Sequence, residues 1–211
     1  MQLVSVNVGT AESIGAGNRT TVSGIDKRPV GGPVYVSVNG LPGDAICEPD
    51  FHGGPDQAVY VYGADDYAWW SEQLGREVRP GTFGDNLTIA GLPRDLNAGD
   101  RLTIGAAVLE ATAPRIPCST LATQMGDTKF GLAFRRAERP GFYFRVIREG
   151  QVAAGDPVSF AENENGSVSM LDLFRLSYAI KPAAESLRRA IEAPIATRMR
   201  DEFIQKLAAV D

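Results

Sequence analysis

The sequence is poor in the residues that build disulfide frameworks and zinc sites. Among 211 residues there are two cysteines, Cys47 and Cys118, and one histidine, His52. The cysteines form no CxxC pair, and two are too few for a disulfide framework, so free thiols in a reducing cytoplasm are expected. A zinc site made of His and Cys needs more ligands than these three residues supply.

Basic charge and long apolar runs are also scarce. The chain has 21 Lys and Arg against 26 Asp and Glu, a net charge of −5, whereas a nucleic-acid-binding protein usually carries a basic excess or stripe. No segment approaches the roughly 18 apolar residues of a membrane helix, and the N-terminus lacks the positive region of a signal peptide. Neither nucleic acid nor a membrane is therefore expected as a partner, and a cytoplasmic location is.

Several cofactor and catalytic motifs are missing. The sequence contains no G-x-G-x-x-G after a strand, no Walker A loop, no G-x-S-x-G elbow and no H-E-x-x-H. Nicotinamide and P-loop chemistry are therefore not expected. What the chain does have is 44% hydrophobic residues, enough for a normal buried core.

The first 160 residues are rich in Gly and Pro, with short apolar runs between turns, which predicts many short strands in a barrel or sandwich. Three short helices are expected among them, at 65–74, 119–125 and 129–138; the first is followed by Gly75 and the last is stopped by Pro140. Strands are expected where apolar residues alternate or form short runs, as at Val4, Val6 and Val8, at Val34, Val36 and Val38, and at 58–62, 87–90, 101–104, 107–113, 142–147 and 157–160.

The last 45 residues differ from the first 160 in sequence pattern, since their apolar residues recur with helical periodicity and glycines are few. Ser169 and Asp172 resemble a capping box before one apolar run, and Pro182 and Pro194 each open a further helix. The predicted organisation is a mainly β (α+β) barrel domain at 1–160, a polar linker at 161–166 and a three-helix extension at 167–211. So small a bundle is marginal alone and is expected to dock on the barrel or on another chain, as in a homodimer.

The strongest local feature is Arg115-Ile-Pro-Cys-Ser119. Pro114 and Pro117 stiffen the approach to Cys118, and a helix that starts just after it, with Ser119 able to cap, offers unpaired N–H groups and a positive dipole end. Together with Arg115, these favour a thiolate that acts as nucleophile or soft-metal ligand. From these residues alone, a buried cysteine acting as a small hydrophobe is an equally good interpretation.

Two weaker motifs lie upstream. In His52-Gly-Gly-Pro-Asp56 the glycines allow a sharp turn, and Asp56 is able to orient His52 as a general base or proton relay, although a structural histidine is the favoured alternative. Asn86, in Gly81-Thr-Phe-Gly-Asp-Asn-Leu87, is able to bind a pterin or phosphate, although the motif is weak and a structural turn is its favoured interpretation. Lys27 and Arg115 would suit an anionic group if they converge on a pocket.

Taken in order, these motifs resemble the MOSC family, named for the C-terminal domain of molybdenum cofactor sulfurase. The resemblance covers nearly the whole chain, because the tail is similar to the three-helix extension of stand-alone bacterial members. It is carried by Lys27-Arg-Pro29, Leu41-Pro-Gly-Asp44, Asp50-Phe-His-Gly-Gly-Pro-Asp56, Gly81-Thr-Phe-Gly-Asp-Asn-Leu87, Gly99-Asp100 and Pro114-Arg-Ile-Pro-Cys118.

The resemblance implies a β-barrel that binds a molybdopterin-type molybdenum cofactor, with Cys118 as the metal ligand. Lys27, Asp56, Asn86 and Arg115 are the further cofactor-binding candidates, and His52 is a candidate proton donor beside Cys118. Relatives in this superfamily reduce N-hydroxylated compounds, such as hydroxylamino base analogues and amidoximes. One cysteine suffices because the cofactor supplies the other sulfur ligands. Cys47 has no counterpart in the family pattern and receives no role.

Three hypotheses about function therefore stand. The first is a molybdenum-dependent oxidoreductase for a small N-hydroxylated substrate, which needs a separate electron-donor reductase because the chain shows no such domain. The second is a non-catalytic carrier of molybdenum cofactor or sulfur, which would bind the cofactor without turnover. The third is a metal-free thiol enzyme in which Cys118 is the nucleophile and His52 the base.

Overall fold

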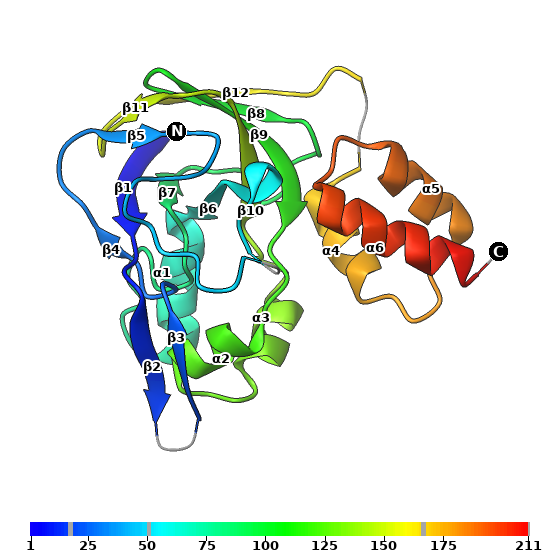
Figure 1. Ribbon diagram of the computed structural model, residues 1–211, viewed down its shortest axis with the longest axis horizontal. Coiled ribbons are helices and arrows are strands. Elements are labelled where there is room, and N and C mark those ends of the chain that lie inside the picture. The colour runs from blue at the N-terminus through cyan, green and yellow to red at the C-terminus, as the bar shows by residue number, and fades with distance from the viewer. Residues whose placement is uncertain (17–18, 50–51, 166–167, 211) are drawn as a thin grey trace.

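The computed structural model describes residues 1–16, 19–49, 52–165 and 168–210. A β-rich body and a bundle of three C-terminal helices lie side by side in it (Figure 1). Asp50 and Phe51 of the predicted His52 motif, and Gly166 of the predicted linker, lie outside the described residues. No helix in these residues is long and apolar enough to cross a membrane.

The body is built on one eight-stranded sheet in the order β12-β8-β9-β10-β6-β7-β1-β4. Neighbouring strands are antiparallel except β6 and β7, which run parallel. The sheet curls until β1 meets the segment before β12, where Gln2 bridges Pro157 and the Leu3 N–H donates to the Asp156 carbonyl at 2.9 Å. The predicted α+β barrel is thus confirmed. Its strands are β1 (Gln2–Val8), β4 (Arg28–Pro29), β6 (Val59–Gly63), β7 (Leu87–Ala90), β8 (Arg101–Ile104), β9 (Ala107–Pro114), β10 (Phe142–Arg148) and β12 (Val158–Ala161).

Strand β1 departs from the simple alternation of Val4, Val6 and Val8. Leu3 and Val6 are buried in the core, whereas Val4 is 44% exposed. The cause is a register shift between Leu3 and Ser5 in the pairing with β7, because an inserted residue reverses the facing of the side chains that follow it.

Two small sheets flank the barrel. β5 (Val34–Val36) pairs with β11 (Gly150–Val152), and β2 (Glu12–Ala16) pairs with β3 (Arg19–Ser23) in a hairpin that projects from the body (Figure 1). The predicted strands include β5, whereas β2, β3, β4 and β11 were not predicted as separate strands.

The helices of the body form where the periodicity predicts them. They are α1 (Ala64–Leu74), α2 (Ser119–Met125) and α3 (Phe130–Ala137), together with a 3₁₀ turn, η1 (Pro55–Gln57). Gly75 ends α1 in the left-handed conformation, as its position predicts. Ser119 does not cap α2, however, because the N-cap residue is Cys118 and Ser119 is already the first helical residue.

The C-terminal helices are α4 (Met170–Ser177), α5 (Ala184–Glu192) and α6 (Thr197–Ala208). Ser169 caps α4 by accepting a 3.1 Å hydrogen bond from the Asp172 N–H. The bundle docks on the barrel: Leu187, Ile195 and Phe203 are fully buried in the same apolar cluster as the strands. Since they share one core, the two parts stabilise each other.

Candidate functional site

One pocket collects residues from loops that are far apart in the sequence. It is lined by Lys27, His52, Asn86, Arg115 and Cys118, five of the six predicted site residues, and its empty space, open mouth included, is about 660 Å³. Lys27 precedes β4, Asn86 precedes β7, Arg115 follows β9, and Cys118 stands at the start of α2. Closure of the barrel therefore brings the ends of distant strands to one open pocket.

Cys118 is the N-cap residue of α2, with extended backbone angles (φ −112°, ψ 173°). Burial by itself raises the pKa of its thiol. A hydrogen bond from His52, the positive charge of Arg115 and the Leu121 N–H outweigh burial, and the pKa falls from 9.0 to about 6. Cys118 is therefore a thiolate at neutral pH, as a metal ligand or a nucleophile requires.

Arg115 lies beneath the pocket and is only 4% exposed. Its guanidinium lies over the Tyr60 ring at 5.4 Å and over the Phe134 ring at 5.9 Å. Burial by itself lowers the pKa of Arg115, but interaction with Tyr60, Tyr143 and the Cys118 thiolate raises it, so the charge is retained. Nε and Nη1 of Arg115 are buried without a hydrogen-bond acceptor among the described residues, and leaving such donors unpaired is costly unless a ligand satisfies them.

Lys27 and Asn86 lie in the pocket wall but are bonded to a carboxylate that the site prediction left out. Lys27 Nζ forms an ion pair with Asp44, and both side chains are 8% exposed. Asn86 Nδ2 donates to Asp44 Oδ2 at 2.8 Å, while its Oδ1 accepts from the Tyr60 N–H at 3.1 Å. Asp44 thus neutralises Lys27, and Arg115 is left as the buried cation that lacks a counter-charge from a carboxylate.

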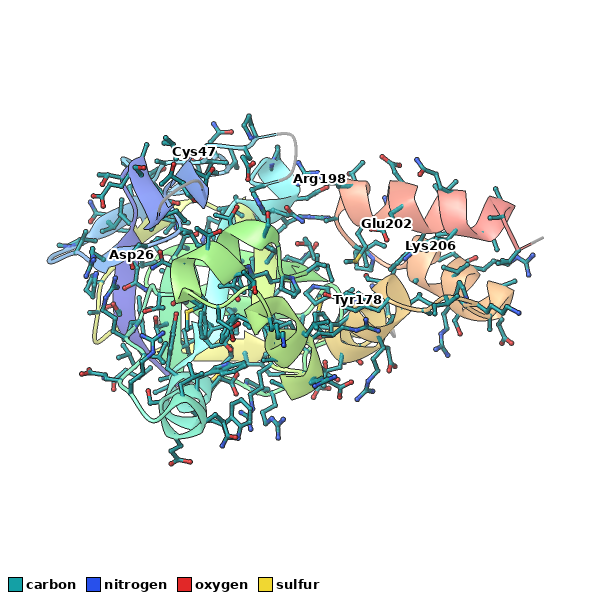
Figure 2. All side chains as sticks on the ribbon, turned by 90° about the horizontal axis from the view of Figure 1, so that it is seen from below. Asp26, Cys47, Tyr178, Arg198, Glu202 and Lys206 are labelled. Atoms are coloured by element: carbon teal, nitrogen blue, oxygen red, sulfur yellow. The ribbon has the colours of Figure 1, made fainter. Side chains whose placement is uncertain are left out.

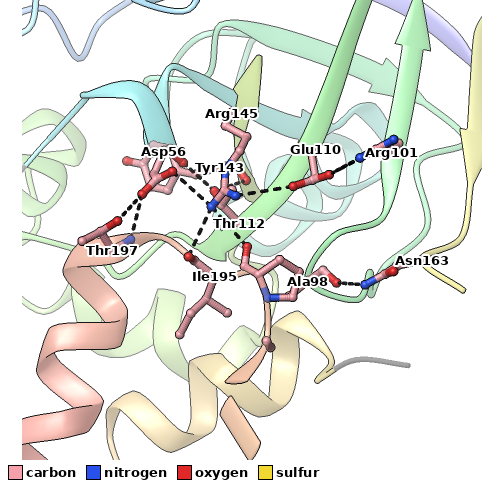
Figure 3. A network of polar contacts seen from close by, with 12 residues as sticks. Asp56, Ala98, Arg101, Glu110, Thr112, Tyr143, Arg145, Asn163, Ile195 and Thr197 are labelled. Carbon is pink, nitrogen blue, oxygen red and sulfur yellow. Dashed lines mark hydrogen bonds and ion pairs between the residues drawn. The ribbon is translucent and has the colours of Figure 1, made fainter. Parts of the chain in front are cut away.

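Asp56 is not brought into the pocket with the other candidates. It lies in η1, and its carboxylate accepts hydrogen bonds from the N–H and Oγ1 of Thr197 at 2.8 and 2.7 Å. It also pairs with Arg145 at 3.1 Å (Figure 3). Burial raises the pKa of Asp56, but the bonds from Thr197 and the charge of Arg145 lower it overall, so the carboxylate stays ionised. This placement anchors the C-terminal helices and does not support Asp56 as a cofactor ligand.

The family model of the MOSC domain matches residues 48–159, more than half of the chain. The chain belongs to the MOSC family. It is 32% identical over 206 residues to the uncharacterized protein YflK of Bacillus subtilis, covering 97% of this chain and 93% of that protein. The crystal structure of YiiM from Geobacillus stearothermophilus has a TM-score of 0.80 at 30% identity, covering 98% of both chains.

A third similarity is to a protein named reductase from Gibberella moniliformis. The identity is 28% over 210 residues, covering 97% of this MOSC chain and 37% of that protein. The MOSC chain therefore corresponds to little more than a third of that larger protein.

The pocket fits the molybdenum cofactor with which the MOSC family is associated. The thiolate of Cys118 is a soft ligand suited to molybdenum, and the unpaired N–H groups of Arg115 suit an anionic group. Across the described parts of the chain, no three His, Cys, Asp or Glu side chains are grouped to hold a metal ion. Any metal here would need its remaining ligands from the cofactor itself.

The structure adds residues that sequence reasoning did not assign to the site. Glu48 lies on the pocket wall with its Oε2 3.9 Å from His52 Nε2, a contact that the i,i+4 spacing was able to suggest. Tyr60 and Tyr143 come from β6 and β10, where they looked like ordinary strand residues. Cys47 is exposed and also lines the pocket.

Proposed function

We propose that this MOSC chain binds a molybdenum cofactor through Cys118 and reduces N-hydroxylated compounds, with electrons from a separate donor protein. The observation that carries the proposal is the pairing, in one pocket, of a thiolate with a buried arginine whose N–H groups lack acceptors. The likeness to a protein named reductase supports an oxidoreductase over a carrier.

Each residue of the pocket has a distinct task in this proposal. Cys118 holds the metal through Sγ, and Arg115 holds an anionic part of the cofactor through Nε and Nη1. The cofactor, when bound, supplies the two-electron chemistry. Lys27, Asp44 and Asn86 have a structural role in the pocket wall, because the charges of Lys27 and Asp44 are already paired with each other.

Proton supply falls to His52. Conversion of N–OH to N–H takes up two electrons and two protons and releases water, so the pocket must deliver protons to the departing oxygen. His52 lines the pocket with Cys118 and lowers the pKa of its thiol, and its Nε2 lies 3.9 Å from Glu48 Oε2. Its side chain is 31% exposed. An imidazole that reaches both the site and solvent is suited to transfer protons between them.

A second candidate function follows from the same pair of residues. A cysteine of lowered pKa hydrogen-bonded to histidine is also the arrangement of a thiol nucleophile and its base. Such an enzyme would retain activity after complete removal of molybdenum, which separates it from the first proposal.

The test is elemental analysis of protein made in a host that synthesises the cofactor. Wild-type protein and Cys47→Ala are expected to contain near-stoichiometric molybdenum and a fluorescent pterin, whereas Cys118→Ala is expected to contain almost no molybdenum. Cys47→Ala is the matched control, because Cys47 is the other thiol of the same pocket. Equal metal content in Cys118→Ala would contradict the proposed ligand.

Activity is then measured on a hydroxylamino purine and an amidoxime with a chemical reductant in place of the donor protein. Turnover that follows molybdenum content supports the reductase. Bound cofactor with no turnover under any donor would instead indicate a carrier.

A further inference from the structure

Among its described residues, 46–49 and 52–57, the loop that carries His52 has two short-range backbone hydrogen bonds. The His52 N–H donates to the Glu48 carbonyl, and the Gln57 N–H to the Gly54 carbonyl, both at 2.9 Å. Gly53 and Gly54 have φ angles of 71° and 83°, in the region where glycine is favoured. A loop with few buried contacts and short-range hydrogen bonds opens locally at small free-energy cost. Its geometry therefore depends on what anchors it from outside.

One anchor is the Thr112 hydroxyl of β9, which donates to the Asp56 carbonyl at 2.6 Å. Another comes from the start of α6, where Arg198 lies 141 residues beyond Gln57. Arg198 Nη1 donates to Gln57 Oε1 at 2.9 Å, and Nη2 donates to the Pro49 carbonyl at 3.2 Å. One guanidinium thus bonds to the chain on both sides of His52. Figure 2 shows Arg198 at the end of α6 nearest the barrel.

The second contact joins Asp56 to the helix terminus itself. Ala196 is the N-cap residue of α6 and has no side chain able to cap, so the Thr197 N–H would lack an acceptor. The Asp56 carboxylate accepts from it at 2.8 Å, in the position where a helix favours an anion. The Asp56 carboxylate therefore caps α6, and the start of α6 in turn holds Asp56 in place.

Strand β10 fixes this junction to the barrel. Arg145 pairs with Asp56 at 3.1 Å and donates to the carbonyls of Pro194 and Ile195, both at 3.2 Å, just before α6 (Figure 3). Arg145 also pairs with Glu110 of β9 at 3.5 Å. The start of α6 is thereby held against the rigid part of the sheet, and it can serve as a fixed support for the loop.

We propose that α6 positions His52 at the pocket, with Arg198, Asp56 and Thr197 as positioning residues. The C-terminal helices then help to shape the site by fixing the position of His52, although none of these three side chains lines the pocket. The functional meaning of this role rests on the proposed function of His52 beside Cys118.

The single histidine makes a direct test simple, because the imidazole NMR signals of His52 are unambiguous in apo-protein. In the wild-type protein, Cys118→Ser is expected to shift these signals, since His52 and Cys118 line the same pocket and His52 lowers the pKa of the thiol. In Arg198→Ala the His52 signals are expected to move toward those of free histidine, and the further change Cys118→Ser is expected to have little effect. Arg198→Lys, which cannot span both acceptors with a planar fork, is expected to be intermediate.

Arg189→Ala is the control, because Arg189 is an exposed arginine of α5, whereas the hydrogen bonds to the loop come from Thr197 and Arg198 of α6. It is expected to leave the His52 signals and their response to Cys118→Ser unchanged. Wild-type His52 signals in Arg198→Ala, with an undiminished response to Cys118→Ser, would overturn the proposal. Circular dichroism checks that each variant is folded, and Arg198→Lys serves if Arg198→Ala is not.

This experiment needs no metal or substrate, so its outcome is separate from that of the proposed function. Molybdenum missing from wild-type protein would refute the cofactor proposal and leave the positioning of His52 intact. Undisturbed His52 signals in Arg198→Ala would refute the positioning and leave the cofactor proposal intact.

Discussion

The ionisation of Cys118 can be tested by removing its histidine partner. Burial raises the pKa of this thiol, and the hydrogen bond from His52 is the largest of the effects that lower it from 9.0 to about 6. In His52→Ala the charge of Arg115 and the Leu121 N–H still favour the thiolate. The pKa is therefore expected to rise from about 6 toward the ordinary thiol value.

The size of the effect depends on what is measured. At about pH 7 a thiol of pKa 6 is roughly 90% ionised, and one of pKa 9 is roughly 1% ionised. The more basic thiolate is intrinsically the better nucleophile, by roughly 20-fold over this interval. The alkylation rate at neutral pH is therefore expected to fall only several-fold even for the full change. The midpoint of the rate against pH is the sharper quantity.

The assay follows alkylation of apo-protein by mass spectrometry over a range of pH. Cys47→Ala is the parent, because it leaves Cys118 as the remaining thiol of the two in the chain. The parent is expected to react with a midpoint near pH 6 and the double variant with His52→Ala at a clearly higher pH. Two results would refute the reasoning: a parent midpoint near that of a free thiol, or identical midpoints in the two proteins.

Two further predictions concern stability. Because the folded-state pKa of Cys118 lies below that of the unfolded chain, the thiolate stabilises apo-protein fully above about pH 9, and this contribution of up to about 4 kcal/mol is lost as the pH falls to about 6. Urea unfolding across this range measures it, and Cys118→Ser is expected to flatten the dependence. Phe203 of α6 is fully buried in the core shared with the barrel, so Phe203→Ala is expected to destabilise the protein by roughly 3–5 kcal/mol and to retain one unfolding transition. Separate transitions of helices and barrel would contradict a shared core.

Elements that bury an apolar face could be predicted closely. Strand β7 and helix α2 begin and end at the predicted residues: β7 is a short, almost continuously buried run, and α2 buries Leu121 and Met125 one turn apart. The hairpin of β2 and β3 was missed as a hairpin, since Ser13 and Val22 are exposed and Ile14 is only partly covered. An exposed pair of strands has no apolar alternation to reveal it.

Several residues of the site could be predicted from the sequence, but the contacts between them could not. Sequence reasoning named Cys118, Arg115 and His52, and the pocket contains all three. It did not find that Asp44 neutralises Lys27, nor that Asp56 caps α6, because both contacts join segments that are distant in sequence.

The sequence by itself determined most of the barrel strands, the three terminal helices and a cysteine at the start of α2, because each depends on neighbours within a few residues. Only the tertiary structure decided which charges remain unpaired. In the folded chain Lys27 pairs with Asp44, Arg115 lacks a carboxylate partner among the described residues, and Asp56 bonds to the start of α6 outside the pocket. Local patterns carry information over one turn or one strand, whereas the pairing of buried charges depends on how the whole chain folds back on itself.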